Sequence, residues 1–257
     1  MKGAIIGDII GSRLERDGAK DYDFDLVTTD CRFTDDTVLT VAVADAILNQ
    51  RDYDEVVMEY ALQYPDAGYG GTFKKWMRGE IMGPYNSWGN GAAMRVSPVG
   101  WLFNDLETVL DQARRSAAIT HDHTEGIKGA QAVASAIFLA RQGGGKEDIR
   151  QYVKQNFGYK LNRNIENIRP DYAFDVSSQG SVPESIIAFL DSRNLVDAIR
   201  LAVSLGGDTD TQAAIAGSIA EAFYGPLEPA LEEVMNAFLP NEFIDVLGAF
   251  DRVLQVS

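Results

Sequence analysis

The chain has 257 residues, of which 46% are hydrophobic, and its formal net charge is −15. This length and apolar content predict a single domain over residues 1–257 with a sizeable core. An acidic surface repels phosphates, so we do not expect non-specific binding to nucleic acids or anionic membranes. Cys31 is the only cysteine, which excludes an intramolecular disulfide and a thiolate zinc site.

The N-terminal residues lack the long apolar core of a signal peptide, and no apolar run reaches the length of a membrane span. The sequence therefore predicts a cytoplasmic protein with no membrane partner.

The first predicted helix carries three glycines spaced four residues apart, Gly3, Gly7 and Gly11. On a helix this spacing places them in one stripe. Glycine costs up to about 1 kcal/mol per helical position relative to alanine, so three on one face predict that another helix packs closely there. A phosphate-binding loop is disfavoured, because the segment has no Gly-Lys-Ser/Thr ending and no strand before it. Glu15 follows this helix in a polar stretch that runs to about Lys20.

The remaining chain reads as a succession of helices. Residues 22–31 look irregular or extended, and residues 162–182 look polar and irregular, a length that hints at a binding role. Pro183 is expected in the first turn of its helix. Strands are scarce and no repeat of fixed period is present, so the sequence predicts an all-α, orthogonally packed fold. It has roughly a dozen helices, the later ones over residues 38–49, 54–64, 72–77, 92–96, 106–118, 126–141, 146–156, 183–191, 195–204, 211–223, 227–239 and 242–256.

Two of these helices begin with clusters of oxygen-bearing side chains. Thr34, Asp35 and Asp36 precede one, and the run from Asp208 to Thr211 precedes another that is rich in alanine. If the two helices lie side by side, four carboxylates meet, and one or two divalent cations would relieve their repulsion. All-oxygen ligation favours Mg²⁺, Mn²⁺ or Ca²⁺ over zinc, and a pair of ions about 3.5–4 Å apart recurs in hydrolases. The plainer alternative is that each cluster is only a helix cap.

Other candidates have equally plain alternatives. His121 is expected to lie at the surface or to contact substrate, and Glu15 alone reads as a solvated side chain. Tyr85 and Trp88, in the glycine-rich loop over residues 83–91, read alone as core or rim residues.

Five ordered motifs together resemble the ADP-ribosylglycohydrolase family, which includes dinitrogenase-reductase-activating glycohydrolase and the ADP-ribosyl-acceptor hydrolases. The resemblance spans roughly residues 3–225. The motifs are Gly7-Asp8 through Gly11 to Glu15, Phe33-Thr34-Asp35-Asp36-Thr37, Gly89-Asn90-Gly91-Ala92-Ala93-Met94-Arg95, Thr120-His121, and Gly206-Gly207-Asp208-Thr209-Asp210-Thr211.

The resemblance implies a dinuclear Mg²⁺ or Mn²⁺ centre in an all-helical domain. Its implied ligands are Thr34, Asp35, Asp36, Asp208, Asp210 and Thr211. Asp35 and Asp210 would touch or orient the attacking water, and Glu15 would contact metal or substrate. The loop at Gly89, Asn90, Gly91 and Ala92 would cradle a diphosphate, and His121 would lie on the substrate side. Tyr69, Tyr85 or Trp88 would stack on adenine.

The implied activity is hydrolysis of the N- or O-glycosidic bond between ADP-ribose and an acceptor, which is a protein side chain or a small molecule. A two-metal phosphohydrolase that acts on a nucleotide-like substrate is an alternative, since four carboxylates and two ions serve it equally well. A non-catalytic ADP-ribose-binding module on the same fold is another. The acceptor linkage, arginine, serine or other, stays open at this point.

Overall fold

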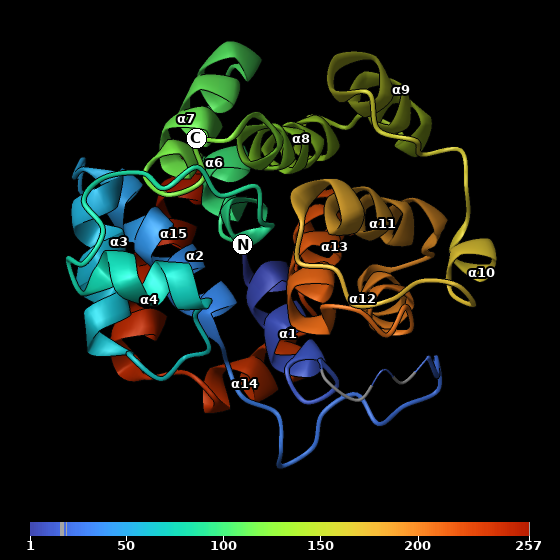
Figure 1. Cartoon of the computed structure of the whole chain (residues 1–257). Coiled ribbons are helices and arrows are strands. Elements are labelled where there is room, and N and C mark those ends of the chain that lie inside the picture. The colour runs from blue at the N-terminus through green and yellow to red at the C-terminus, as the bar shows by residue number, and fades with distance from the viewer. Residues whose placement is uncertain (16–17, 19, 257) are drawn as a thin grey trace.

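The computed structural model describes residues 1–15, 18 and 20–256 (Figure 1). This part of the chain forms no strand beyond an isolated antiparallel bridge between Gly89 and Ser177, which confirms the all-α prediction. Its helices are α1 (Lys2–Gly11), α2 (Asp35–Leu48), α3 (Tyr53–Gln63), α4 (Gly71–Met77), α5 (Gly91–Met94), α6 (Ser97–Leu102), α7 (Leu106–Ala118), α8 (Thr124–Arg141), α9 (Lys146–Phe157), α10 (Ile165–Ile168), α11 (Ser178–Asp191), α12 (Leu195–Val203), α13 (Thr209–Tyr224), α14 (Pro229–Ala237) and α15 (Asn241–Val256).

Most predicted helices are found within a few residues of their expected bounds, but the prediction that residues 162–182 are irregular is partly wrong. The Asn164 side chain accepts from the backbone N–H of Asn167 and starts α10. Ser177 likewise accepts from Gly180 and starts α11, so Pro183 lies inside that helix and not in its first turn. Polar composition suggested a loop here, whereas the same polar residues act as helix caps.

The glycine stripe of α1 packs against α13, as the spacing predicted. A Cβ atom on Gly3 would lie 2.2 Å from the carbonyl oxygen of Gly217, and one on Gly7 would lie 2.2 Å from that of Ala213. A Cβ on Gly11 would meet the carbonyl oxygen of Thr209 at 2.4 Å. Since side chains never approach backbone this closely, only glycine permits the observed separation of the two helices.

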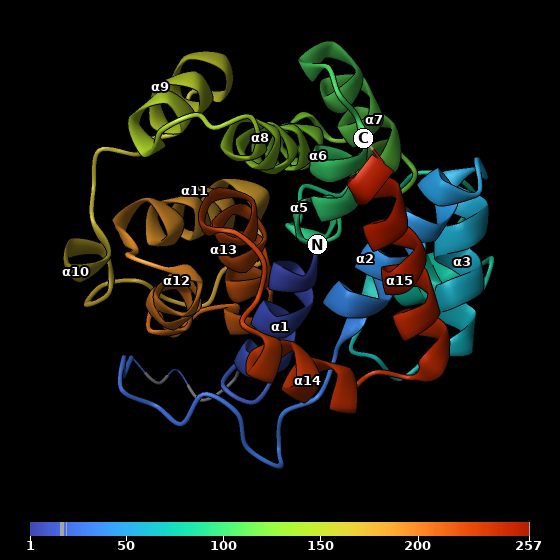
Figure 2. The ribbon, with the colours of Figure 1, turned by 180° about the vertical axis from the view of Figure 1, so that it is seen from behind.

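The expectation that α2 and α13 lie side by side needs a correction, because α1 lies between them (Figures 1 and 2). The small side chains of α13 bring it close to α1 rather than to α2. On the other side of α13 lie α11 and α12, and α8 packs across α13 and α11. The α3 and α15 helices cover α2, and buried apolar side chains from Met1 to Phe250 form a contiguous cluster.

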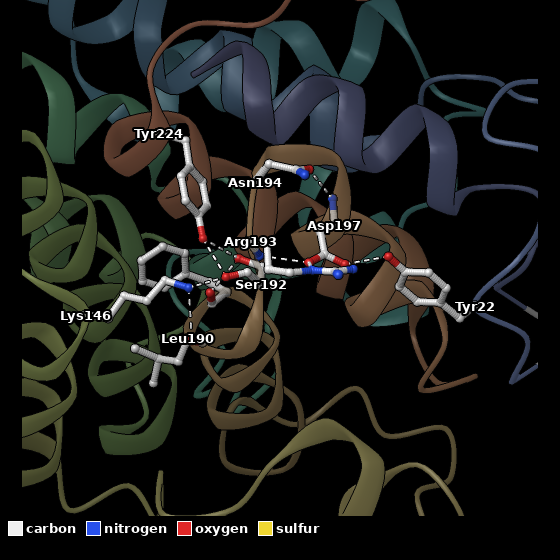
Figure 3. Close-up of polar contacts among 9 residues, drawn as sticks. Tyr22, Lys146, Leu190, Ser192, Arg193, Asn194, Asp197 and Tyr224 are labelled. Carbon is white, nitrogen blue, oxygen red and sulfur yellow. Dashed lines mark hydrogen bonds and ion pairs between the residues drawn. The ribbon is translucent and has the colours of Figure 1, made fainter.

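The α11–α12 turn is tied to α9 by Lys146 (Figure 3). Its ammonium group donates to the carbonyl oxygens of Leu190, at 3.0 Å, and Ser192. Three aromatic rings, those of Phe189, Phe223 and Tyr224, surround the same ammonium at 5.3–5.8 Å from their centroids.

Among the described residues no helix combines the length and apolar character needed to cross a membrane.

Candidate metal centre and substrate cavity

Asp8, in the middle of α1, is a fully buried carboxylate that joins α1 to the start of α2. Its Oδ2 accepts from the backbone N–H of Thr34 at 2.9 Å and from both the N–H and the hydroxyl of Thr37, at 3.1 and 2.5 Å. Its Oδ1 accepts from the Thr34 hydroxyl at 2.7 Å. Asp8 belongs to one of the five motifs, but the sequence predicts no role for it. The signal was present, since Asp8 is the only charged residue between Lys2 and Arg13.

Two groups of three carboxylates lie at this junction and share Asp210. One joins Asp8, Asp36 and Asp210, and the other joins Glu15, Asp208 and Asp210. Within each group, one oxygen from every residue lies within 4.8 Å of the others. The structure thus brings together four of the predicted site acids and adds Asp8.

The donor set fits a hard divalent cation. Asp36 is buried, and its Oδ1 has no hydrogen-bond partner among the described residues. Its Oδ2 accepts only long bonds of 3.4 Å from the hydroxyls of Thr34 and Thr211. A buried carboxylate oxygen without a donor is costly, and a cation ligated through oxygen would relieve that cost.

The electrostatics of the acidic groups point the same way. Burial, followed by the charge of Asp210, raises the pKa of Asp8 to about 7. The same two causes, in the same order, raise the pKa of Asp35, Asp36 and Asp208 well above the usual range. Carboxylates that resist ionisation together are stabilised as anions when a positive charge lies between them.

A cavity of about 380 Å³ opens above the acidic groups. Most of the predicted site residues line it, namely Glu15, Asp35, Asp36, Tyr85, Gly89, Asn90, Gly91, His121, Asp208, Asp210 and Thr211. Asp35 belongs to neither group of three, although it faces the same cavity beside Gly68.

Three predicted residues lie outside this lining. Thr34 is buried beneath it and bonds to Asp8, and Ala92 is fully buried behind the loop. Trp88 points outward, with 55% of its surface exposed, and its ring lies edge-on to that of His123.

The glycine loop differs in one respect from the expected phosphate cradle. The backbone N–H of Asn90 donates to the carbonyl of Val176 at 2.8 Å, and that of Gly89 donates to the Ser87 hydroxyl at 3.1 Å. The Asn90 side chain donates to Asp208 at 2.6 Å. The Asn90 side chain therefore braces the acidic site, and at Gly89 and Asn90 the loop offers the cavity space rather than free N–H donors.

Fold and site define an all-helical protein with a buried acidic centre at the floor of a cavity. A family model described as ADP-ribosylglycohydrolase matches residues 1–239, and the chain belongs to that family. This confirms the resemblance drawn from the five motifs.

Named relatives agree with this assignment. ADP-ribosylhydrolase ARH3 of Gallus gallus is 30% identical over an alignment of 272 residues, covering 80% of this chain and 74% of the relative. ADP-ribosylarginine hydrolase Tri1 of Pseudomonas putida (strain GB-1) is 26% identical and covers 88% and 69%. A solved structure described as an ADP-ribosylglycohydrolase-related protein complex shares the fold, with a TM-score of 0.74 at 23% identity over 98% of this chain and 95% of that one.

Proposed function

We propose that this protein is a metal-dependent hydrolase that cleaves the glycosidic bond between ADP-ribose and an acceptor, releasing ADP-ribose. The proposal rests on one observation: two groups of three carboxylates share Asp210 at the floor of the cavity. The family, and the hydrolase activities for which its relatives are named, support the same reaction.

The residues that would hold Mg²⁺ or Mn²⁺ are those of the two carboxylate groups, with the hydroxyls of Thr34 and Thr211 beside them. Bound there, divalent cations would supply positive charge to orient ribose hydroxyls and activate water. Two groups of oxygens that share one residue favour two ions over one. The resemblance implies that Asp35 is a metal ligand. Because Asp35 lies outside both groups, we propose for it only the other expected role, that of orienting the attacking water.

The chain's own residues would position the reacting atoms. Asp35 and Asp210 face the cavity, where they would orient a water for attack at the anomeric carbon. Nearby carboxylates, Glu15 among them, would stabilise positive charge that develops on the ribose ring as the bond to the acceptor breaks. Gly89 and Gly91 would leave room for the diphosphate, with His121 on the same side. The fit of the adenine ring to Tyr85 or to the outward-facing Trp88 is part of the proposal.

Incubation of the purified protein with arginine- and serine-ADP-ribosyl peptides, and with small ADP-ribosyl compounds, tests the reaction. Each substrate is assayed with Mg²⁺, with Mn²⁺ and with a chelator. Free ADP-ribose as the product, formed only with metal, is the expected result. AMP and ribose phosphate would indicate a phosphohydrolase instead, and tight ADP-ribose binding without turnover of any linkage would indicate a binding module.

A further inference from the structure

Arg95 is the largest fully buried side chain among the described residues, and it lies at the cavity wall beneath His121. Its Nη2 donates to the carbonyl of Ser116 and to the hydroxyl of Thr120, both at 2.9 Å. Its Nε and Nη1 have no hydrogen-bond partner within the described part of the chain. Burial lowers the pKa of Arg95 to about 10, so the guanidinium keeps its charge at neutral pH. Among the described residues no carboxylate forms an ion pair with this guanidinium, and Asp35 acts on it only as a nearby charge. A buried charge without an ion pair is expensive, which indicates that the position serves the site.

The Thr120 hydroxyl connects Arg95 to His121. Its oxygen accepts from Arg95 and lies 2.8 Å from Nδ1 of His121. Arginine can only donate, so the hydroxyl oxygen accepts from Arg95 and its own hydrogen remains available to Nδ1. Tyr85 also forms a hydrogen bond with this hydroxyl, so the single hydrogen of the hydroxyl goes either to the phenol oxygen or to Nδ1, and the tautomer of His121 distinguishes the two. An imidazole whose Nδ1 accepts carries its hydrogen on Nε2.

The Nε2 atom of His121 faces the glycine loop inside the cavity. A Cβ on Gly91 would lie 3.0 Å from Nε2, and one on Gly89 would lie 3.4 Å from it. We propose that Arg95 is a positioning residue which, through Thr120, holds His121 as the Nε2–H tautomer, so that the imidazole donates a hydrogen bond to an anionic oxygen of the substrate beside this loop.

The electrostatics suit such a donor. Burial, and then the charge of Arg95, lower the pKa of His121 well below its usual value, so the ring is neutral. A neutral ring presents either a hydrogen or a lone pair to the cavity, and only the hydrogen attracts an anion. Donation from Arg95 to Thr120 polarises the hydroxyl and strengthens the next bond in the series. That the oxygen belongs to a diphosphate rests on the proposed function.

Nuclear magnetic resonance of the ¹⁵N-histidine-labelled protein, without substrate, tests the tautomer directly. The chain has only two histidines, His121 and His123, so a His123→Asn variant assigns both rings. We expect Nδ1 of His121 to give the signal of an unprotonated nitrogen and Nε2 that of a protonated one. A protonated Nδ1 in the wild-type spectrum would overturn the proposal.

Two substitutions test the connection through Thr120. Thr120→Val removes the hydroxyl at nearly constant shape, and it should give mixed tautomers and raise KM about tenfold with kcat within about twofold. Thr120→Ser keeps the hydroxyl and should restore both the spectrum and KM. Arg95→Met should act like Thr120→Val. A Thr120→Val protein whose His121 signals match the wild type would show that the connection does not set the tautomer.

Failure of the proposed function would look different. The spectra can be recorded without turnover. If His121 carries its hydrogen on Nε2 and this depends on Thr120, the positioning role is supported. If the same protein hydrolyses no ADP-ribosyl compound, the proposed reaction is refuted. Conversely, turnover with an Nδ1–H ring would refute only the positioning role.

Discussion

Gly3 and Gly217 face each other across the α1–α13 interface, and neither position has room for a methyl group. A Cβ on either residue would lie 2.2 Å from the carbonyl oxygen of the other. The close approach continues to Gly7, which is followed by Asp8, and to Ala213, which lies one turn after Asp210. The packing of small residues therefore sets the separation of the Asp8 and Asp210 carboxylates, which form one group with Asp36.

Gly7→Ala should separate α1 from α13 and weaken cation binding, although no carboxylate is removed. Overpacking against the Ala213 carbonyl should cost about 3 kcal/mol, which corresponds to roughly 6–12 °C in unfolding temperature. Calorimetry with Mn²⁺ should show at least about tenfold weaker binding. Gly248→Ala is the matched control: in α15 the nearest atom to its new Cβ is a side-chain nitrogen of Arg252 at 3.5 Å, so stability and binding should hold. Unchanged Mn²⁺ affinity in a folded Gly7→Ala protein would show that this interface does not set the site.

The sequence predicted the helices and the close packing on the glycine stripe, but not which helix supplies the partner. Helical periodicity and glycine spacing are local signals. They predict which face of a helix is closely packed, but not which other helix packs against it. The pairing of α1 with α13 depends on contacts about 200 residues apart, such as the Thr209 hydroxyl donating to the carbonyl of Gly11 at 2.8 Å. The single domain over residues 1–257 stays a prediction that the contiguous apolar cluster supports.

The site was predicted in composition but not in arrangement. Asp35 and Asp36 are neighbours in sequence and line the same cavity, but successive residues on a helix are about 100° apart and only one of them lies in a group of three carboxylates. Only Asp36 joins Asp8 and Asp210, and no local pattern distinguishes it from Asp35. The only local signal at Asp8 is a lone charge in an apolar helix, and such an acid resembles a satisfied core residue, which its four accepted hydrogen bonds also make it.

Asp210→Asn should impair cation binding more than Glu15→Gln. Asp210 belongs to both carboxylate groups, whereas Glu15 belongs to one. If each group holds one ion, Asp210→Asn should abolish binding at both, and Glu15→Gln should leave one ion bound. Equilibrium dialysis with Mn²⁺ gives the stoichiometry, and activity should fall by at least about 100-fold for Asp210→Asn. Equal residual stoichiometry in the two variants would contradict a shared role for Asp210.

Gly68→Ala should lower activity through Asp35. Gly68 has a φ of +118°, and a Cβ there would lie 3.0 Å from the Asp35 carboxylate. The segment is held to the start of α2 by the Asp35 N–H, which donates to the carbonyl of Ala67 at 2.9 Å. We expect a loss of about tenfold or more in kcat, because Asp35 is displaced from the position that we propose orients water. Gly79→Ala is the control, since Gly79 also has a positive φ but nothing within 4 Å of a new Cβ. It should lose about 1 kcal/mol of stability and retain activity. Similar kcat losses in both would trace the effect to backbone strain alone.

Lys146→Met should destabilise the protein without affecting catalysis. It removes the ammonium that binds two carbonyl oxygens of the α11–α12 turn among three aromatic rings, while keeping an apolar stem. Loss of charge-assisted bonds should cost about 2–3 kcal/mol, or roughly 4–12 °C in unfolding temperature. The control Lys154→Met removes an exposed bond to Asn162 and should change stability by less than about 0.5 kcal/mol. Equal melting temperatures for the two variants would show that the Lys146 ammonium, with its two carbonyl partners and three aromatic rings, contributes nothing to stability.

Divalent cations should stabilise the protein at pH 7.5 far more than at pH 5. Burial and mutual repulsion raise the pKa of Asp8 to about 7 and also raise the pKa of Asp36 and Asp208. A raised folded-state pKa means that the native protein holds protons that the unfolded chain releases. The metal-free protein should therefore lose stability as the pH rises from about 4 to about 7. A cation replaces those protons, so its effect should appear over the same window.

Thermal unfolding with and without Mg²⁺, at ionic strength matched with NaCl, measures this difference. At a free concentration about 100 times Kd, binding adds about 2.7 kcal/mol, or roughly 5–11 °C, at pH 7.5. Near pH 5 the protonated carboxylates should leave little of that shift. Asp210→Asn separates the site from the general repulsion of an acidic surface, because the surface charge remains while the cation-dependent shift should vanish. A Mg²⁺ shift of the same size at both pH values, or one that survives in Asp210→Asn, would place the stabilising cation elsewhere on the protein.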